Sequence, residues 1–220
     1  MTISALSPVD HAANGRRLRF YYGPMDCGKS TLALQMDYNQ ARQGRRGLVL
    51  TRNDRSLSPR VTSRIGLAHD AIEVTDDLDL MALVRSAGPV DYLICDEACF
   101  YTVAQVEQLA DLVDQHHVDV FAFGLATDFR TEFFPASRRL FELADEVCRL
   151  QVEVLCWCGR PGLLNARIVN GVVARQGAQV VIGDTLRGDG DTEPGDDVRY
   201  QVLCRRHHRC GDLGPGVSTV

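Results

Sequence analysis

The chain has 220 residues, of which 45% are hydrophobic and 24% are charged, as in a soluble globular protein with one α/β core and a small appendage. Its net charge of −5 disfavours a general nucleic-acid-binding protein, and no apolar run is long enough to span a membrane. Residues 1–17 lack the apolar core of a signal peptide, so we expect them to form a flexible tail on a cytoplasmic protein.

The first predicted strand, residues 18–22, leads directly into a glycine-rich motif. Residues 23–30 read GPMDCGKS and fit the pattern G-x-x-x-x-G-K-[ST] of phosphate-binding loops. The segment after the motif lacks glycine and proline and predicts a helix over residues 29–43. In such a loop the backbone N–H groups point at one anion, while Lys29 reaches the outer phosphates and Ser30 holds Mg²⁺. A chance glycine-rich turn is the alternative interpretation.

The composition of the chain supports the phosphate-loop interpretation. Lys29 is the only lysine among the 24 lysine and arginine residues. A chain that uses arginine everywhere else therefore keeps one compact ammonium on a flexible stem, at the position where the motif requires it.

Strands and helices alternate after the loop, as far as residue 144. Short apolar runs predict strands over residues 47–50, 71–74, 91–95 and 118–125. Helical periodicity predicts helices over residues 77–85, 103–117 and 135–144. Residues 51–68 are polar and show no regular pattern. The alternation predicts a P-loop (RecA-like) α/β fold, in which helices flank a parallel sheet.

From about residue 150 the pattern becomes strand-like. Short runs suggest strands over residues 151–155, 166–169, 172–174, 179–182 and 199–203. Asn170-Gly171 is a hairpin signal, and the acidic, glycine-rich tract 184–197 is expected to be a mobile insertion. The chain is thus expected to comprise four parts, namely a tail over 1–17, a nucleotide-binding α/β domain over 18–149, a small, mostly β module over 150–211, and a tail over 212–220.

An acidic pair follows the predicted strand 91–95. Asp96 occupies the place where related phosphate-loop proteins carry the acidic residue that orients Mg²⁺ or its waters. Glu97 is then free for another role, because a carboxylate beside the γ-phosphate can accept the proton of an attacking hydroxyl or water. The alternative is that the pair only caps a helix that begins near Thr102.

Four of the eight cysteines gather in the last third of the chain. In a reducing compartment, clustered cysteines indicate a metal site rather than disulfides. A ligand set suited to a tetrahedral, structural Zn²⁺ is formed by Cys156, Cys158, Cys204 and His207. His208 and Cys210 are alternative ligands, and reduced, unliganded thiols are the alternative to a metal site.

These motifs together resemble those of the small, zinc-containing thymidine kinases found in many bacteria and in animal cytosol. Residues 23–31 (GPMDCGKST) resemble the family's GPM-x-SGKST, and residues 96–100 (DEACF) resemble its DE-x-QF. Residues 124–137 are similar to the bacterial form GLRTDFRGELFPGS. Further similar stretches, which extend the resemblance over about residues 18–208, are 54–55, 63–67, 156–159, 179–183 and 200–207.

The resemblance implies Mg²⁺-dependent transfer of the ATP γ-phosphate to the 5′-hydroxyl of thymidine, a salvage step in DNA precursor synthesis. It makes Glu97 the general base and places Lys29 and Arg55 at the transferring phosphate. The residues implied to bind ATP and Mg²⁺ are Gly23, Pro24, Met25, Asp26, Cys27, Gly28, Lys29, Ser30, Thr31 and Asp96. Those implied to enclose thymidine are Met25, Phe100, Leu125, Phe129, Phe134, Gly183 and Tyr200. A C-terminal module folded over the base, a homotetramer and feedback inhibition by thymidine triphosphate (dTTP) are also implied.

The chain departs from the family pattern at three places. Cys27 replaces a serine, Cys99 replaces a glutamine, and the insertion 184–197 lies where the base-covering loop is expected, bulging into solvent. The main rival hypothesis is a P-loop ATPase or nucleotide switch whose zinc-ribbon module binds a partner protein. A third is a kinase-like protein that binds nucleotide without activity. Nucleotide turnover that thymidine stimulates would distinguish the kinase from the ATPase.

Overall fold

The computed structural model of the chain describes residues 15–52, 60–62, 68–151, 153–179, 184–185 and 198–215. The predicted site residues Arg55 and Gly183, and most of the acidic tract, lie outside these ranges. Within them, no helix has both the length and the apolar character that crossing a membrane requires.

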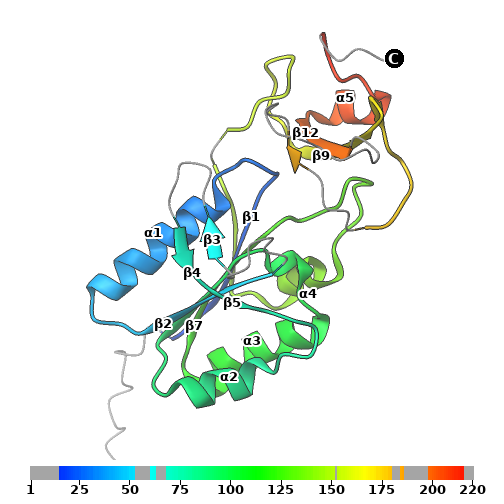
Figure 1. Ribbon diagram of the computed structural model, residues 1–220. Coiled ribbons are helices and arrows are strands. Elements are labelled where there is room, and N and C mark those ends of the chain that lie inside the picture. Colours follow the sequence, from blue (N-terminus) through cyan, green and yellow to red (C-terminus); the bar gives the residue numbers. More distant parts are fainter. Residues whose placement is uncertain are drawn as a thin grey trace, which may run out of the picture.

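A six-stranded sheet forms the centre of the larger part of the chain (Figure 1). In the spatial order β5-β2-β6-β7-β1-β8, its strands are Ile72–Glu73, Gly47–Thr51, Tyr92–Cys95, Asp119–Gly124, Leu18–Tyr22 and Glu146–Arg149. Every neighbouring pair is parallel. β6 and β7 are buried at every position, which explains their nearly continuous apolar sequence. The predicted parallel sheet is confirmed, and β8 is an edge strand that the sequence pattern did not predict.

Helices cover both faces of this sheet. Helix α1 (Lys29–Arg42) lies on one face, and α2 (Leu80–Ala87), α3 (Val103–His116) and α4 (Pro135–Leu143) lie on the other (Figure 1). Each face has its own buried apolar cluster, one around α1 and a larger one around the other three helices. Helix α2 begins three residues later than predicted, because the side chain of Asp79 caps its first turn.

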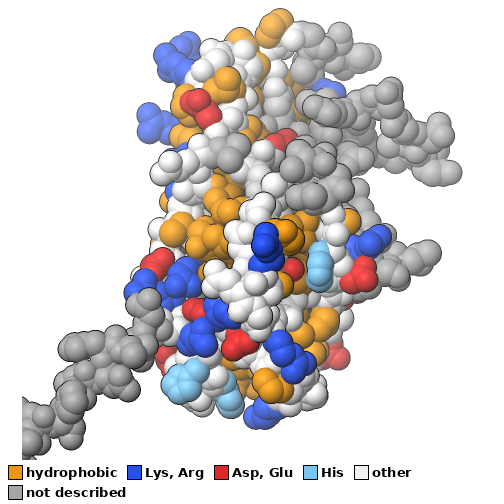
Figure 2. All heavy atoms as spheres, turned by 90° about the vertical axis from the view of Figure 1, so that its left-hand side faces the viewer, with side chains coloured by type: hydrophobic (Ala, Val, Ile, Leu, Met, Phe, Trp, Pro, Cys, Tyr) orange, Lys and Arg blue, Asp and Glu red, His pale blue; other side chains and the backbone are white. Residues whose placement is uncertain are grey.

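A short hairpin accompanies α1. It consists of β3 (Arg60–Thr62) and β4 (Ala68–Asp70), and Val61 packs into the apolar cluster on the α1 face. The expectation that residues 51–68 lack regular structure is therefore wrong at Thr51, at residues 60–62 and at Ala68. On this side of the molecule, acidic and basic side chains are interspersed over the α/β core rather than gathered in a field of one sign (Figure 2).

The C-terminal module contains a second sheet and a short helix. In the order β10-β9-β12-β11, its strands are Val172–Val173, Leu164–Val169, Val198–Leu203 and Asp184–Thr185. Helix α5 (Arg205–Cys210) follows β12. Asn170 and Gly171 join β9 to β10 with positive φ angles of 49° and 78°, as the predicted hairpin turn requires.

The C-terminal module differs from the predicted pattern at two segments. The described residues of 151–155 form no strand, since only Leu155 makes an isolated bridge, to Pro161. The predicted strand 179–182 lies outside the described residues except for Gln179. Helix α5 was not predicted, because its sequence RRHHRC has no apolar periodicity.

The two faces of the β9–β12 strand pair have different partners. Ala166 and Ile168 of β9 and Leu203 of β12 pack around the cysteines of the module. Asn165 and Arg167 project from the opposite face and contact the α/β core, because alternate residues of a strand point to opposite sides. The module therefore lies over the edge of the parallel sheet where the phosphate loop is found (Figure 1).

Candidate active site

The phosphate-loop motif forms the connection between β1 and α1. Asp26 and Gly28 have positive φ angles of 66° and 80°, so the chain curls back before α1 begins. No side chain caps the first turn of α1, which leaves its amides available at the helix end. Lys29 is 7% exposed, and its Nζ donates to the carbonyl oxygen of Pro24 at 2.9 Å. Curled amides beside one ammonium are the arrangement that binds phosphate groups.

Cys27 fills the inside of this loop. Its side chain is buried against Gly23, where a Cβ atom would lie 2.5 Å from the sulfur. The Lys29 ammonium lies 4.0 Å from Cys27 Sγ. Burial raises the pKa of the Cys27 thiol, although Lys29 opposes that effect, so the residue is a neutral thiol. Cys27 thus packs in the loop without adding a charge to it.

Ser30 and Asp96 meet beside the loop. Asp96 follows β6 directly, and its Oδ2 accepts a hydrogen bond from Ser30 Oγ at 2.8 Å. Asp96 is 3% exposed, and its Oδ1 has no partner among the described residues. Burial, reinforced by the neighbouring Glu97, raises the pKa of Asp96 despite the Ser30 hydroxyl and Lys29. A buried carboxylate oxygen without a partner, next to a serine hydroxyl, suits a hard divalent cation such as Mg²⁺.

Glu97 adopts an unusual backbone conformation at the same edge of the sheet. Its φ angle of 51° is positive, and a single 3₁₀ turn (η1, Ala98–Phe100) follows it. Its Oε2 accepts a weak hydrogen bond from Cys99 Sγ at 3.6 Å. Helix α3 is capped instead by Thr102, which forms a capping box with Gln105. The alternative that the acidic pair caps this helix is therefore wrong.

Most of the described residues predicted to enclose thymidine follow the carboxyl ends of β1, β6 and β7, whereas Tyr200 lies within β12 of the C-terminal module. The rings of Phe100 and Phe134 contact each other edge to face, with centroids 5.2 Å apart. Leu125 continues directly from β7, and Phe129 follows in the next turn. The guanidinium of Arg167 links Tyr200 to Phe129, because it donates to the Tyr200 hydroxyl and stacks on the Phe129 ring. Arg55 and Gly183, which lie outside the described residues, are not placed.

Asn165 and Arg167 are contact residues that sequence reasoning missed. Asn165 is buried, and its Oδ1 accepts a hydrogen bond from the Met25 amide at 2.8 Å, which joins the C-terminal module to the phosphate loop. A cavity of about 220 Å³ lies beside this contact and is lined by Gly23, Thr127 and Asn165 among others. A polar residue in a short strand normally indicates a position that faces solvent. In the sequence, only the apolar residues on either side of Asn165 and Arg167 indicated that these two side chains could be buried.

The Cys/His cluster of the C-terminal module has the geometry of a metal site. Its ligand atoms, which lie within 4.8 Å of one another, belong to Cys156, Cys158, Cys204 and His207. The two alternative ligands point elsewhere, since Cys210 Sγ contacts the His207 carbonyl and His208 Nε2 hydrogen-bonds the Phe129 carbonyl. A hydrogen bond from the His207 amide lowers the pKa of Cys204, which favours the thiolate. Three cysteines and one histidine suit a structural Zn²⁺.

Comparisons with known proteins identify the family of the chain. The family model described as thymidine kinase matches residues 16–208. The chain is 53% identical over 201 residues to a protein named thymidine kinase from Cutibacterium acnes, covering 90% of both chains. It is 52% identical over 196 residues to the protein of the same name from Streptomyces coelicolor, covering 87% of this chain and 88% of the other. For the Agrobacterium fabrum protein of that name, the identity is 38% over 197 residues, with coverage of 87% and 95%. The chain therefore belongs to the thymidine kinase family.

Proposed function

We propose that this protein transfers the γ-phosphate of ATP to the 5′-hydroxyl of thymidine and releases thymidine monophosphate. The phosphate-binding loop and the acidic pair Asp96-Glu97 lie side by side at one edge of the sheet, and the proposal rests on this arrangement. Membership of the thymidine kinase family supports thymidine as the acceptor.

The phosphate loop supplies the donor half of the reaction. In the proposed complex, the loop amides and Lys29 bind the β- and γ-phosphates, and Lys29 exchanges its contact with the Pro24 carbonyl for phosphate oxygens. Ser30 and Asp96 would hold Mg²⁺, which neutralises charge on the phosphates when it is bound. Arg55 would assist at the transferring group. Phosphoryl transfer needs mainly positioning and electrostatic stabilisation, and these groups provide both.

Glu97 supplies the acceptor half. Its carboxylate would accept the proton of the thymidine 5′-hydroxyl as the oxygen attacks the γ-phosphorus. Cys99 touches one carboxylate oxygen of Glu97, at the position where family members carry glutamine. The nucleoside would lie among Met25, Phe100, Leu125, Phe129, Phe134 and Tyr200. The backbone near Gly183 would contact the edge of the thymine base.

The C-terminal module completes the proposed site. With Zn²⁺ bound to its Cys/His cluster, residues 150–211 would cover the nucleoside and keep water from the γ-phosphate, which limits wasteful hydrolysis of ATP. A homotetramer, feedback inhibition by dTTP and a cytoplasmic location also belong to the proposal, on the strength of the family resemblance.

A thymidine phosphorylation assay tests the proposal. Purified protein with ATP, Mg²⁺ and labelled thymidine is expected to form thymidine monophosphate, whereas a Lys29→Ala variant is not. Glu97→Gln should lower kcat by about 100-fold or more while ATP binding persists, because the general base is lost. ATP turnover that is indifferent to thymidine would instead support the ATPase hypothesis. Unchanged kcat in Glu97→Gln would remove Glu97 from the role of base.

A further inference from the structure

Arg167 is a buried cation in the middle of β9. The residue is 3% exposed, although its guanidinium is always charged. Within the part of the chain that the structure describes, it has no carboxylate partner at ion-pair distance. Burying a guanidinium removes it from water at a cost in free energy, so its contacts within the protein must compensate for the lost hydration.

Three hydrogen bonds to described residues hold the guanidinium in place, one from each of its nitrogen atoms. Arg167 Nε donates to Tyr200 Oη at 2.9 Å, across the β9–β12 pair. Its Nη1 donates to the Ala178 carbonyl at 2.7 Å, and its Nη2 donates to the Gln179 carbonyl at 3.0 Å. One planar group thus joins the strand that carries Tyr200 to the segment after β10.

The same guanidinium covers the ring of Phe129 in the α/β core. Its central carbon lies 3.8 Å from the ring centroid, a close cation–π contact. Gln179 reinforces the link, because its Nε2 donates to Asp128 Oδ2 at 3.3 Å. The Phe129 carbonyl is fixed in turn by His208 Nε2 at 3.0 Å. Arg167 therefore connects both sides of the boundary between the core and the module.

We propose that Arg167 is a positioning residue for thymidine, which holds Phe129, Tyr200 and residues 178–179 in one arrangement. The inference rests on the proposed function, since Phe129 and Tyr200 are proposed thymidine contacts. Without the guanidinium these groups are no longer held in place in the free protein. Binding of thymidine must then order them, and the entropy cost of this ordering weakens the affinity for thymidine. The phosphate loop makes none of its described contacts with Arg167, so the affinity for ATP stays unchanged.

The chain offers a matched control for this arginine. Arg175 lies in the same module, and its Nη2 donates to the carbonyl oxygens of His208 and Arg209 at 2.5 Å and 3.1 Å. Lysine cannot reproduce three divergent hydrogen bonds or the planar stacking at Arg167, whereas a point charge can still reach the neighbouring carbonyl groups near Arg175. Arg167→Lys and Arg175→Lys therefore make the same chemical change with different expected outcomes.

Steady-state kinetics with each substrate varied separately tests the inference. Arg167→Lys is expected to raise the KM for thymidine about ten-fold and leave the KM for ATP within about two-fold. Arg175→Lys should leave both values within about two-fold, and zinc content should match the wild type in both variants. An unchanged thymidine KM in Arg167→Lys, or equal increases for both substrates, overturns the inference.

Tyr200→Phe provides a second test if Arg167→Lys does not fold. It removes the hydroxyl that accepts from Arg167 Nε and keeps the ring, so a rise of about three-fold in the thymidine KM alone is expected. An unchanged value overturns the inference by this route. A wild-type enzyme that leaves thymidine unphosphorylated overturns the proposed function and this inference together. An active wild type with an unaffected variant overturns the inference alone.

Discussion

At the scale of single residues, the edge of the sheet that carries the candidate active site contains backbone strain. Asp26, Glu97 and Thr131 all have positive φ angles in segments that follow strands of the parallel sheet. For Asp26 and Glu97 the conformation shapes the phosphate loop and the turn that carries the proposed base. Thr131 differs, because a β-branched residue tolerates this region of φ least, and the similar bacterial motif has glycine at this position.

Thr131→Gly should therefore stabilise the protein. The φ angle of 71° lies in a turn that the Asp128 carboxylate fixes by accepting from the amides of Arg130 and Glu132. Glycine removes the steric cost of this angle, and after its own entropy cost we expect a gain of about 0.5–1 kcal/mol in the free energy of unfolding. Urea denaturation measures the change. Asn170→Gly is the control, since asparagine already tolerates its φ of 49° and should be nearly neutral. Lower stability in Thr131→Gly would contradict the strain argument.

At the scale of elements, the sequence predicted those segments whose local signals agree with their tertiary role. The loop between β1 and α1, the apolar strand β7 and the helical face of α3 carry strong local patterns. Strand β8 has only four residues and is half exposed at the sheet edge, so it shows no apolar run. Helix α5 has no amphipathic face, and its buried residues are His207, a member of the Cys/His cluster, and His208.

The candidate site was likewise predictable only where local sequence signals agree with the tertiary role of a residue. Asp96 and Glu97 could be identified because they follow a buried strand of a parallel sheet, whose carboxyl ends bind ligands. Asn165 and Arg167 could not be identified from the sequence, because their role depends on which face of β9 meets the core. Strand alternation gives two faces but does not say which one is covered, and the contact between Asn165 and Met25 joins segments more than 100 residues apart in the chain.

Metal removal should unfold the C-terminal module. The apolar cluster of this module is small and consists of Cys156, Ala166, Ile168, Val173, Leu203, Cys204 and Leu213. Without the metal, such a core is too small to support a stable fold. A chelator, or Cys204→Ser, is expected to lower thymidine phosphorylation by more than about ten-fold while ATP binding persists.

The fluorescence of Trp157 reports this transition. It is the only tryptophan in the chain, and its ring stacks on His207 with centroids 4.3 Å apart. Its emission should shift when the metal is removed, and Cys210→Ser should leave both emission and activity unchanged, since Cys210 is not a cluster ligand. Full activity in protein shown to be free of metal would contradict a structural zinc.

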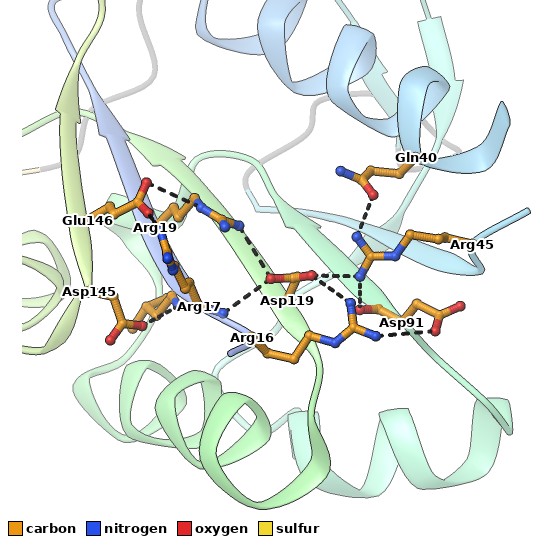
Figure 3. Close-up of polar contacts among 10 residues, drawn as sticks. Arg16, Arg17, Arg19, Gln40, Arg45, Asp91, Asp119, Asp145 and Glu146 are labelled. Carbon is orange, nitrogen blue, oxygen red and sulfur yellow. Dashed lines mark hydrogen bonds and ion pairs between the residues drawn. The ribbon is translucent and has the colours of Figure 1, made fainter. Parts of the chain in front are cut away.

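At the scale of the whole molecule, the two edges of the parallel sheet have different roles. The carboxyl edge carries the phosphate loop and the acidic pair, whereas the amino edge carries a network of ion pairs centred on Asp119 (Figure 3). Arg16, Arg19 and Arg45 all donate to this carboxylate, as does the backbone amide of Arg17. The network ties the starts of β1 and β7 to the segment before β2, far from the proposed chemistry.

Asp119→Asn should therefore weaken the fold and leave substrate binding unchanged. Burial opposes the charge of Asp119, but hydrogen bonds from Arg45 and Arg16 outweigh that effect and lower its pKa. A lowered pKa in the folded state means that the carboxylate stabilises the protein above the unfolded-state pKa and loses this effect as pH falls through the folded-state value. We expect the variant to lose about 2 kcal/mol of unfolding free energy at pH 7 and less in acid, because the wild type is itself weakened there.

Urea denaturation at pH 7 and at pH 3 to 4 measures this difference between wild type and variant. Glu142→Gln is the matched control, because Glu142 pairs with Arg138 and Arg139 on the exposed surface of α4, where ion pairs contribute little. Its unfolding midpoint should equal that of the wild type at both pH values, and the KM values of Asp119→Asn should equal those of the wild type. A stability difference for Asp119→Asn that stays constant with pH would show that the lost energy comes from packing rather than from the charge of the carboxylate.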